Sequence, residues 1–150
     1  FKMIKLINIF LHTILLNNFL LSQNSNDIIG IWLNEEKDAK IEIYKSENLF
    51  FGKLIWLKEP KDINGKFKTD KNNPNKNLRN EKLLGLKILS NLMWNNKEKE
   101  WINGSIYNAR DGKTYQVFAN LSEKKLKLRG YIGFSLFGKT TIWTKSNLIN

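Results

Sequence analysis

The stretch KLKLRGYIGFSLFGKTTIWTK, residues 125–145, decides the fold. It contains two runs with the composition of β-strands, residues 125–132 and 139–145, joined by an apolar link, residues 133–138, with a glycine at each end. Far away in the chain, Gly30-Ile31-Trp32 opens another such run. A tryptophan in the first strand and a cation after a tryptophan in the last predict a sheet that closes on itself as a barrel.

The rest of the sequence also has the pattern of short strands. Residues 39–46 alternate between apolar and polar side chains, and Asp111-Gly112 is a strong signal for a tight turn between two strands. Short strands joined mostly by short links are typical of an antiparallel barrel or sandwich. The predicted strands are residues 29–34, 39–46, 49–58, 83–94, 99–108, 112–121, 125–132 and 139–145. For residues 83–94 a helix is the alternative, and Gly85 and the neighbouring strands favour the strand.

One long irregular segment, residues 59–80, interrupts this pattern. A loop of this length in a compact domain is usually functional or disordered. Its polar side chains have two open roles. Asp70 and the neighbouring asparagines can hold a divalent cation through oxygen ligands, or Asp70 can pair with Arg79 and brace the loop. We favour the brace, because the spacing of a known calcium loop is absent.

The composition limits the classes of function. The 150 residues have the length of one domain, and the absence of cysteine excludes disulfides, thiolate metal sites and cysteine nucleophiles. The formal net charge of +11 would suit a polyanion. We attribute it instead to a solvated surface, because the lysines are scattered. Only Arg79, Arg110 and Arg129 are arginine, whose fixed fork is harder to replace at a bidentate site.

Residues 1–22 have the organisation of a secretory signal peptide, with Lys2 and Lys5 before a long apolar run. Polar residues interrupt this run and weaken it as a membrane span. We therefore predict cleavage that leaves residues 23–150 as a single β-barrel domain without a membrane span, in the periplasm or outside the cell. An uncleaved anchor is the alternative. The only histidine, His12, lies in the signal segment, so histidine-based catalysis and metal binding are not expected of the barrel.

Short motifs follow one another along the chain in this order: Gly30-Ile31-Trp32, Gly52-Lys53-Leu54-Ile55-Trp56-Leu57, Asp70 with Asn73-Pro74, Leu84-Gly85-Leu86, Gly104 with Ile106-Tyr107, Asp111-Gly112-Lys113-Thr114-Tyr115, Arg129-Gly130-Tyr131-Ile132-Gly133 and Gly138-Lys139-Thr140-Thr141-Ile142-Trp143-Thr144-Lys145. The ordered set resembles the "domain of unknown function 2147" family of secreted bacterial proteins over residues 29–145. The resemblance implies an all-β, antiparallel, approximately eight-stranded lipocalin-like (calycin-type) barrel preceded by a signal peptide. It implies no known activity.

The resemblance also implies how the barrel closes. In lipocalin-like barrels a basic residue of the last strand packs over the tryptophan of the first strand. Lys145 would therefore cover Trp32 in a cation–π contact, which contributes about 0.5–2 kcal/mol. The family usually ends in Trp-Thr-Arg, and this chain has lysine at the last of these positions.

Four residues are our candidates for binding a ligand. An eight-stranded barrel has room for packed side chains or for one small ligand, so each aromatic residue is either core or lining. We select Trp56, Trp101 and Tyr115 as lining. Arg129 alternates with leucines along its strand. Facing inward it would hold a ligand carboxylate by a bidentate pair, and otherwise it is a surface arginine or part of an internal ion pair.

The leading hypothesis is a periplasmic or secreted protein that binds a small apolar or amphipathic ligand, such as a lipid or fatty acid, in its barrel. The alternative is a structural or interaction module of the cell envelope with a filled barrel and an envelope partner. A basic surface for an anionic glycan or nucleic acid is a third reading, and the signal segment argues against nucleic acid. We predict no enzyme activity, no catalytic residue, no cofactor and no metal.

Overall fold

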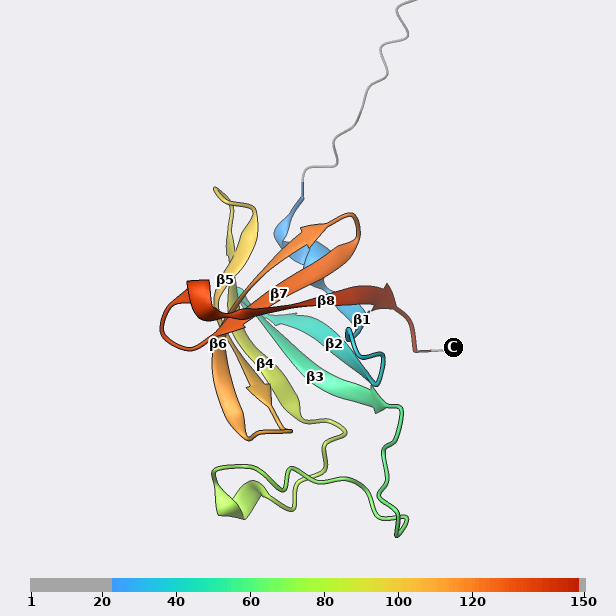
Figure 1. The fold of residues 1–150 in the computed structure, drawn as a ribbon. Coiled ribbons are helices and arrows are strands. Elements are labelled where there is room, and N and C mark those ends of the chain that lie inside the picture. Colours follow the sequence, from blue (N-terminus) through green and yellow to red (C-terminus); the bar gives the residue numbers. More distant parts are fainter. Residues whose placement is uncertain (1–22, 149–150) are drawn as a thin grey trace, which may run out of the picture.

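The computed structural model describes residues 23–148, in which eight antiparallel strands close into a barrel (Figure 1). Each strand pairs with the next one in the chain, and the last strand returns to the first. The predicted all-β barrel is confirmed. The strands are β1 (Gly30–Leu33), β2 (Ala39–Ser46), β3 (Leu49–Leu57), β4 (Lys87–Asn95), β5 (Glu100–Asn108), β6 (Lys113–Ser122), β7 (Lys125–Tyr131) and β8 (Lys139–Ser146).

The described part of the chain also contains three short 3₁₀ helices: η1 (Ser25–Ile28), η2 (Lys76–Leu78) and η3 (Ser135–Phe137). None of the helices within residues 23–148 has the length and apolar character needed to cross a bilayer. The predicted signal segment, residues 1–22, lies outside the described residues.

The alternation of side chains explains the strands and their faces. In β2, Ala39, Ile41 and Ile43 point into the barrel and are buried, as the sequence pattern predicts. The largest difference from prediction is the start of β4, which begins at Lys87. The residues before it form a turn that hydrogen-bonds to Leu54 of β3, so they are bonded without being in a strand.

One end of the barrel is filled by large side chains and covered by η1. Trp32 and Trp101 are at most 1% exposed, and the Phe50 ring meets the edge of Trp101 at 6.5 Å between ring centroids. Each indole N–H is satisfied by the helix: Trp32 Nε1 donates to the Ile28 carbonyl oxygen at 2.8 Å, and Trp101 Nε1 donates to that of Ser25 at 3.0 Å. We call this the closed end.

Lys145 completes the closed end beside β1. It is paired with Trp32 across the β1–β8 ladder, and its Nζ lies 4.4 Å from the centroid of the Trp32 ring. The same Nζ donates a hydrogen bond to the Ile29 carbonyl oxygen at 2.7 Å. This is the contact that the family resemblance implies. Burial lowers the pKa of Lys145 below its usual value of 10.5, because the charged form loses part of its hydration.

Replacing Lys145 with methionine tests the energy of this closure. Methionine keeps the length and packing of the side chain but removes the cation–π contact and the hydrogen bond. We expect the free energy of unfolding to fall by about 1 kcal/mol, measured by urea denaturation. Lys127→Met, at an exposed position of β7, is the matched control and should be nearly neutral. An equal loss in both variants would contradict a specific role for Lys145.

Candidate functional site

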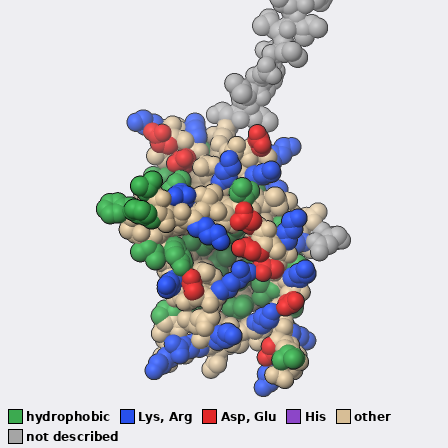
Figure 2. All heavy atoms as spheres, in the orientation of Figure 1, with side chains coloured by type: hydrophobic (Ala, Val, Ile, Leu, Met, Phe, Trp, Pro, Cys, Tyr) green, Lys and Arg blue, Asp and Glu red, His purple; other side chains and the backbone are tan. Residues whose placement is uncertain are grey.

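The end of the barrel opposite η1 opens into a cavity of about 1010 Å³. Its walls are mostly apolar, and its rim carries acidic, basic and tyrosine side chains. Figure 2 shows hydrophobic side chains in a recess with charged side chains beside it. The apolar walls include Ala39, Ile41, Leu54, Leu57, Ile88, Ile106, Val117, Leu128 and Trp143, and the rim includes Glu36, Asp38, Lys58, Glu59, Lys68, Tyr107, Arg110, Asp111, Tyr115 and Lys139.

The cavity is a funnel that narrows toward the closed end. Ile41, Val117 and Leu128, at its floor, are at most 1% exposed, so little open space reaches them. Ile106 and Tyr115, nearer the rim, are only half-buried. The space that a ligand can use is therefore the upper part of the barrel, and it is smaller than the full volume, which includes the mouth.

Two inward-facing glycines differ in how tightly their surroundings are packed. A Cβ atom added at Gly104 would lie 2.6 Å from Cδ2 and 2.7 Å from Cγ of Leu92, which is fully buried. A Cβ atom added at Gly130 would be 3.7 Å from both Ile106 and Tyr115, an ordinary contact distance. The interior is tightly packed around Gly104, whereas there is room for a side-chain atom beside Gly130.

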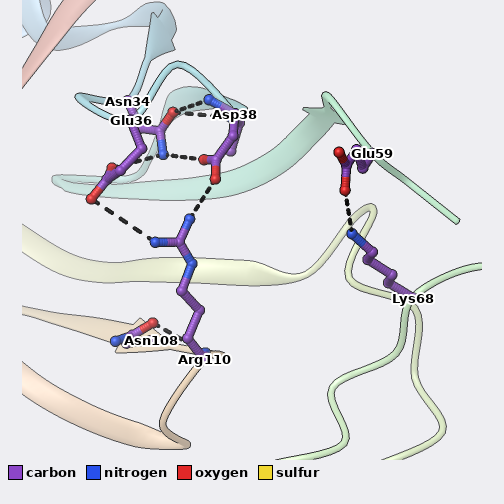
Figure 3. Close-up of polar contacts among 8 residues, drawn as sticks. Asn34, Glu36, Asp38, Glu59, Lys68, Asn108 and Arg110 are labelled. Atoms are coloured by element: carbon purple, nitrogen blue, oxygen red, sulfur yellow. Dashed lines mark hydrogen bonds and ion pairs between the residues drawn. The ribbon is translucent and has the colours of Figure 1, made fainter. Parts of the chain in front are cut away.

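An ion pair crosses the mouth of the cavity. Arg110 lies in the turn between β5 and β6, and its Nη2 is 2.6 Å from Oδ2 of Asp38, in the turn between β1 and β2 (Figure 3). Its Nη1 lies 3.9 Å from Oε1 of Glu36. Asn34 donates hydrogen bonds from Nδ2 to both carboxylates, which holds them together. Because β1 and β5 stand on opposite sides of an eight-stranded barrel, Arg110 bridges the opening rather than lying along its edge.

The long β3–β4 connection is fixed against the β5–β6 hairpin at this same end. Asp70 is fully buried and accepts hydrogen bonds from Tyr107 Oη and from Asn73 Nδ2, both at 2.7 Å. Asn72 Nδ2 donates to the backbone carbonyl oxygen of Arg110 at 2.9 Å. A Cβ atom at Gly112 would collide with the Asn72 carbonyl oxygen, so the close approach of the two segments requires glycine there.

The predicted loop brace therefore has a different geometry from a direct ion pair. Asp70 and Arg79 are both described, and no ion pair joins them. Asp70 contacts Tyr107, and Arg79 Nε donates to the Asn73 carbonyl oxygen at 2.8 Å. The two residues hold the same loop through Asn73, because the Asn73 side chain donates to Asp70 while its backbone accepts from Arg79.

The Tyr107–Asp70 bond makes stability depend on pH. Burial, and then the hydrogen bond to Asp70, raise the pKa of Tyr107 from 10 to about 12. The unfolded chain releases this proton near pH 10, whereas the folded protein keeps it until about pH 12. The stabilisation is therefore fully present below about pH 10 and is lost as the pH rises from about 10 to 12.

Replacing Tyr107 with phenylalanine should remove this pH-dependent contribution to the free energy of unfolding. It should also leave the buried Asp70 with one hydrogen-bond donor fewer. We expect a loss of about 1.5–3 kcal/mol in the free energy of unfolding at neutral pH, and a smaller loss above pH ~11. Denaturant titrations at neutral pH and at the higher pH measure the two losses. Tyr115→Phe, whose hydroxyl donates to the exposed Asp111 at 2.7 Å, is the control and should cost less. The same loss at both pH values for Tyr107→Phe would contradict the assignment.

Of the four predicted ligand-binding residues, the structure places only Tyr115 in the cavity wall. Trp101 points inward, but it lies at the closed end beneath η1 and contacts Trp94 and Phe50. Trp56 lies opposite Lys40 on the outer face, and Lys40 Nζ is 5.2 Å from the centroid of its ring. These two tryptophans therefore belong to packing and not to the cavity.

Arg129 also lies outside the cavity. Its neighbours Leu128 and Gly130 face inward, so its own side chain faces outward, as in the surface alternative. Its guanidinium donates to the carbonyl oxygens of Ser135 at 2.7 Å and Leu136 at 3.0 Å, and to Thr140 Oγ1 at 3.0 Å. It holds the β7–β8 connection and is not available to a ligand carboxylate inside the barrel.

The residues that form the mouth are not among those predicted from the sequence. Glu36 and Asp38 are not among the candidates named from the sequence, and Arg110 is named only as one of three arginines. The scarcity of arginine in a lysine-rich chain was the available signal, because it marks positions where a bidentate fork is useful. Their partners could not be found from spacing, since Arg110 and Asp38 are 72 positions apart.

Comparisons with known proteins agree with this architecture. The structure of "Protein HP1028 from the human pathogen Helicobacter pylori", described as belonging to the lipocalin family, is similar with a TM-score of 0.67 and 29% sequence identity. The match covers 80% of this chain and 83% of that chain. No curated protein matches the chain. The sequence profile of the family described as "Uncharacterized protein conserved in bacteria (DUF2147)" matches residues 30–145. The chain therefore belongs to the DUF2147 family, and its fold is that of a lipocalin-like barrel.

Proposed function

We propose that this protein binds one small amphipathic molecule, such as a lipid or fatty acid, in the open half of its barrel. The observation that carries the proposal is the cavity, which has apolar walls, a polar rim and a packed floor. Its size falls near the range of ligand pockets, about 300–1,000 Å³. An apolar chain would occupy the funnel, and a polar headgroup would stay at the rim.

The rim favours a headgroup that both donates and accepts hydrogen bonds. Acidic and basic side chains are both present there, and the nearest arginine, Arg110, is already paired with Asp38. The hydroxyl of Tyr115, which lines the cavity, donates to Asp111, and this leaves its oxygen free to accept. We therefore expect neutral or zwitterionic amphiphiles to bind at least as well as fatty acids.

Fluorescence quenching by brominated amphiphiles tests the proposal. Trp143 lines the cavity, whereas Trp32 and Trp101 fill the closed end. A bound brominated chain should therefore quench mainly Trp143, and Trp143→Phe should remove most of the effect while binding persists. Brominated monoacylglycerol and brominated fatty acid would compare headgroups. If neither quenches the protein, or if quenching survives in Trp143→Phe, the cavity is not the binding site and the filled-barrel interaction module gains support.

We further propose that the protein is exported and works in the periplasm or outside the cell, as a binding protein rather than an enzyme. The support is the signal-like composition of residues 1–22 and the absence of histidine and cysteine from residues 23–150. Fractionation of a bacterium that expresses the full chain measures this directly. Retention in the cytoplasm, without shortening of the chain, would contradict it.

A further inference from the structure

The connection between β7 and β8 carries the most exposed apolar cluster of the described residues. Four large side chains lie within six positions: Ile132, Phe134, Leu136 and Phe137 are 64%, 78%, 79% and 81% exposed. Figure 2 shows a hydrophobic patch that projects from one side of the molecule, where Figure 1 places η3. Single exposed apolar residues are ordinary, but a contiguous group of this kind marks an interaction surface.

The cluster is held outward by its own backbone. Arg129 reaches from β7 and binds the carbonyl oxygens of Ser135 and Leu136, and the Phe137 N–H donates to the Phe134 carbonyl oxygen at 3.2 Å. Gly138 packs so closely that an added Cβ would lie 2.7 Å from the Gly130 carbonyl oxygen. These contacts fix the connection in a shape that presents the apolar side chains to solvent.

A partner must complement both the apolar side chains of residues 132–138, which we call the tip, and the positive charge of the protein. The chain has a net charge of +11, and residues 1–22 contribute only two lysines to it. Lys139, directly after the tip, is exposed. An anionic lipid surface offers both complements: an apolar interior for the tip, and negative headgroups for Lys139 and for the net positive charge of the protein. A second copy of the chain is a poorer match, because it carries the same net positive charge.

We propose that the β7–β8 connection, residues 132–138, inserts its apolar side chains into the surface of an anionic lipid membrane. Ile132 and Phe137 of this connection also line the cavity, so the barrel mouth would face the lipid. The inference stands on the exposed tip and the charge, and it does not require the cavity to be occupied.

A spin label placed at the tip tests the insertion in the full chain. The chain has no cysteine, so Ser135→Cys provides one labelling site between the apolar residues without removing any of them. Asn96→Cys, in the exposed turn between β4 and β5 at the closed end, is the control site. The vesicles contain equal parts of phosphatidylglycerol and phosphatidylcholine. Accessibility of each label to oxygen and to a water-soluble nickel chelate is measured with and without vesicles.

We expect the label at position 135 to gain oxygen collisions and lose nickel collisions when vesicles are added, while the label at position 96 does not change. High salt should weaken the effect, because it screens the lysines. Adding Phe134→Ser and Leu136→Ser, which leaves the cavity lining intact, should lower vesicle binding through the tip by tenfold or more. An unchanged label 135 on vesicles, or a label already shielded without vesicles in a dimer of the chain, would overturn the proposal.

Discussion

Replacing Gly130 with leucine is expected to weaken binding of an amphipathic ligand by about 10- to 100-fold while the barrel stays folded. Gly130 faces the cavity from β7, and its missing side chain leaves the space between Ile106 and Tyr115. A leucine side chain would occupy the space that the ligand's apolar chain needs. A ligand forced into the filled site would meet the cost of overpacking, about 1–3 kcal/mol.

The structure provides matched controls for this variant. Gly130→Ala adds only a Cβ at an ordinary contact distance and should bind nearly as the natural protein does. Lys127→Leu introduces the same side chain at an exposed position of the same strand and should leave binding unchanged. Dissociation constants for a brominated amphiphile and urea denaturation of each variant separate binding from stability. Unchanged binding in a folded Gly130→Leu protein would contradict the placement of the ligand in the upper barrel.

Replacing Trp101 with alanine is expected to lower the free energy of unfolding by about 3–5 kcal/mol, the largest effect on stability that we predict. Trp101 is fully buried, contacts the rings of Phe50 and Trp94, and satisfies its N–H on the Ser25 carbonyl oxygen. Alanine would leave a large cavity at the closed end and release η1. In a domain of ordinary stability, this loss is a large part of the total free energy of unfolding.

Trp56→Ala is the comparison that makes the result specific. Trp56 is only partly buried, on the outer face beside Lys40, and we expect a loss of about 1 kcal/mol, measured by urea denaturation. Because the alanine variant of Trp101 could fail to fold, Trp101→Phe provides a milder test: it should fold, lose some stability and bind the amphiphile normally. A folded Trp101→Phe protein that no longer binds would place Trp101 at the ligand after all.

The strands were predictable from sequence because alternation and turn residues are local. The run predicted at residues 39–46 has the same bounds as β2, and Asp111-Gly112 lies in the β5–β6 turn as expected. The closure of the sheet was predicted from the tryptophan-containing runs at both ends of the chain, and the resemblance implied the contact between Lys145 and Trp32. Only β4 was misplaced appreciably, since its first residues are bonded to β3 through a turn that has no strand periodicity.

The site was less predictable, because alternation gives the face of a residue but not its height in the barrel. Trp101 faces inward, as predicted. Its strand begins directly after a turn at the closed end, so Trp101 lies at that end of the barrel and not at the mouth. For Arg129, alternation with Leu126 and Leu128 indicates the outer face that the structure shows, and the inward alternative followed only from the analogy with a ligand-binding barrel. The β-bulge between Lys40 and Ile41 also changes the register beside Trp56.

The central claim is that the upper barrel is hollow and holds a ligand. The most direct test is to export the full chain through a bacterial periplasm and to compare its native and denatured mass spectra. We predict a mass excess that disappears on denaturation and that is absent from Gly130→Leu prepared in the same way. A natural protein that carries no excess, even after incubation with mixed envelope lipids, would contradict the claim and favour a filled-barrel interaction module.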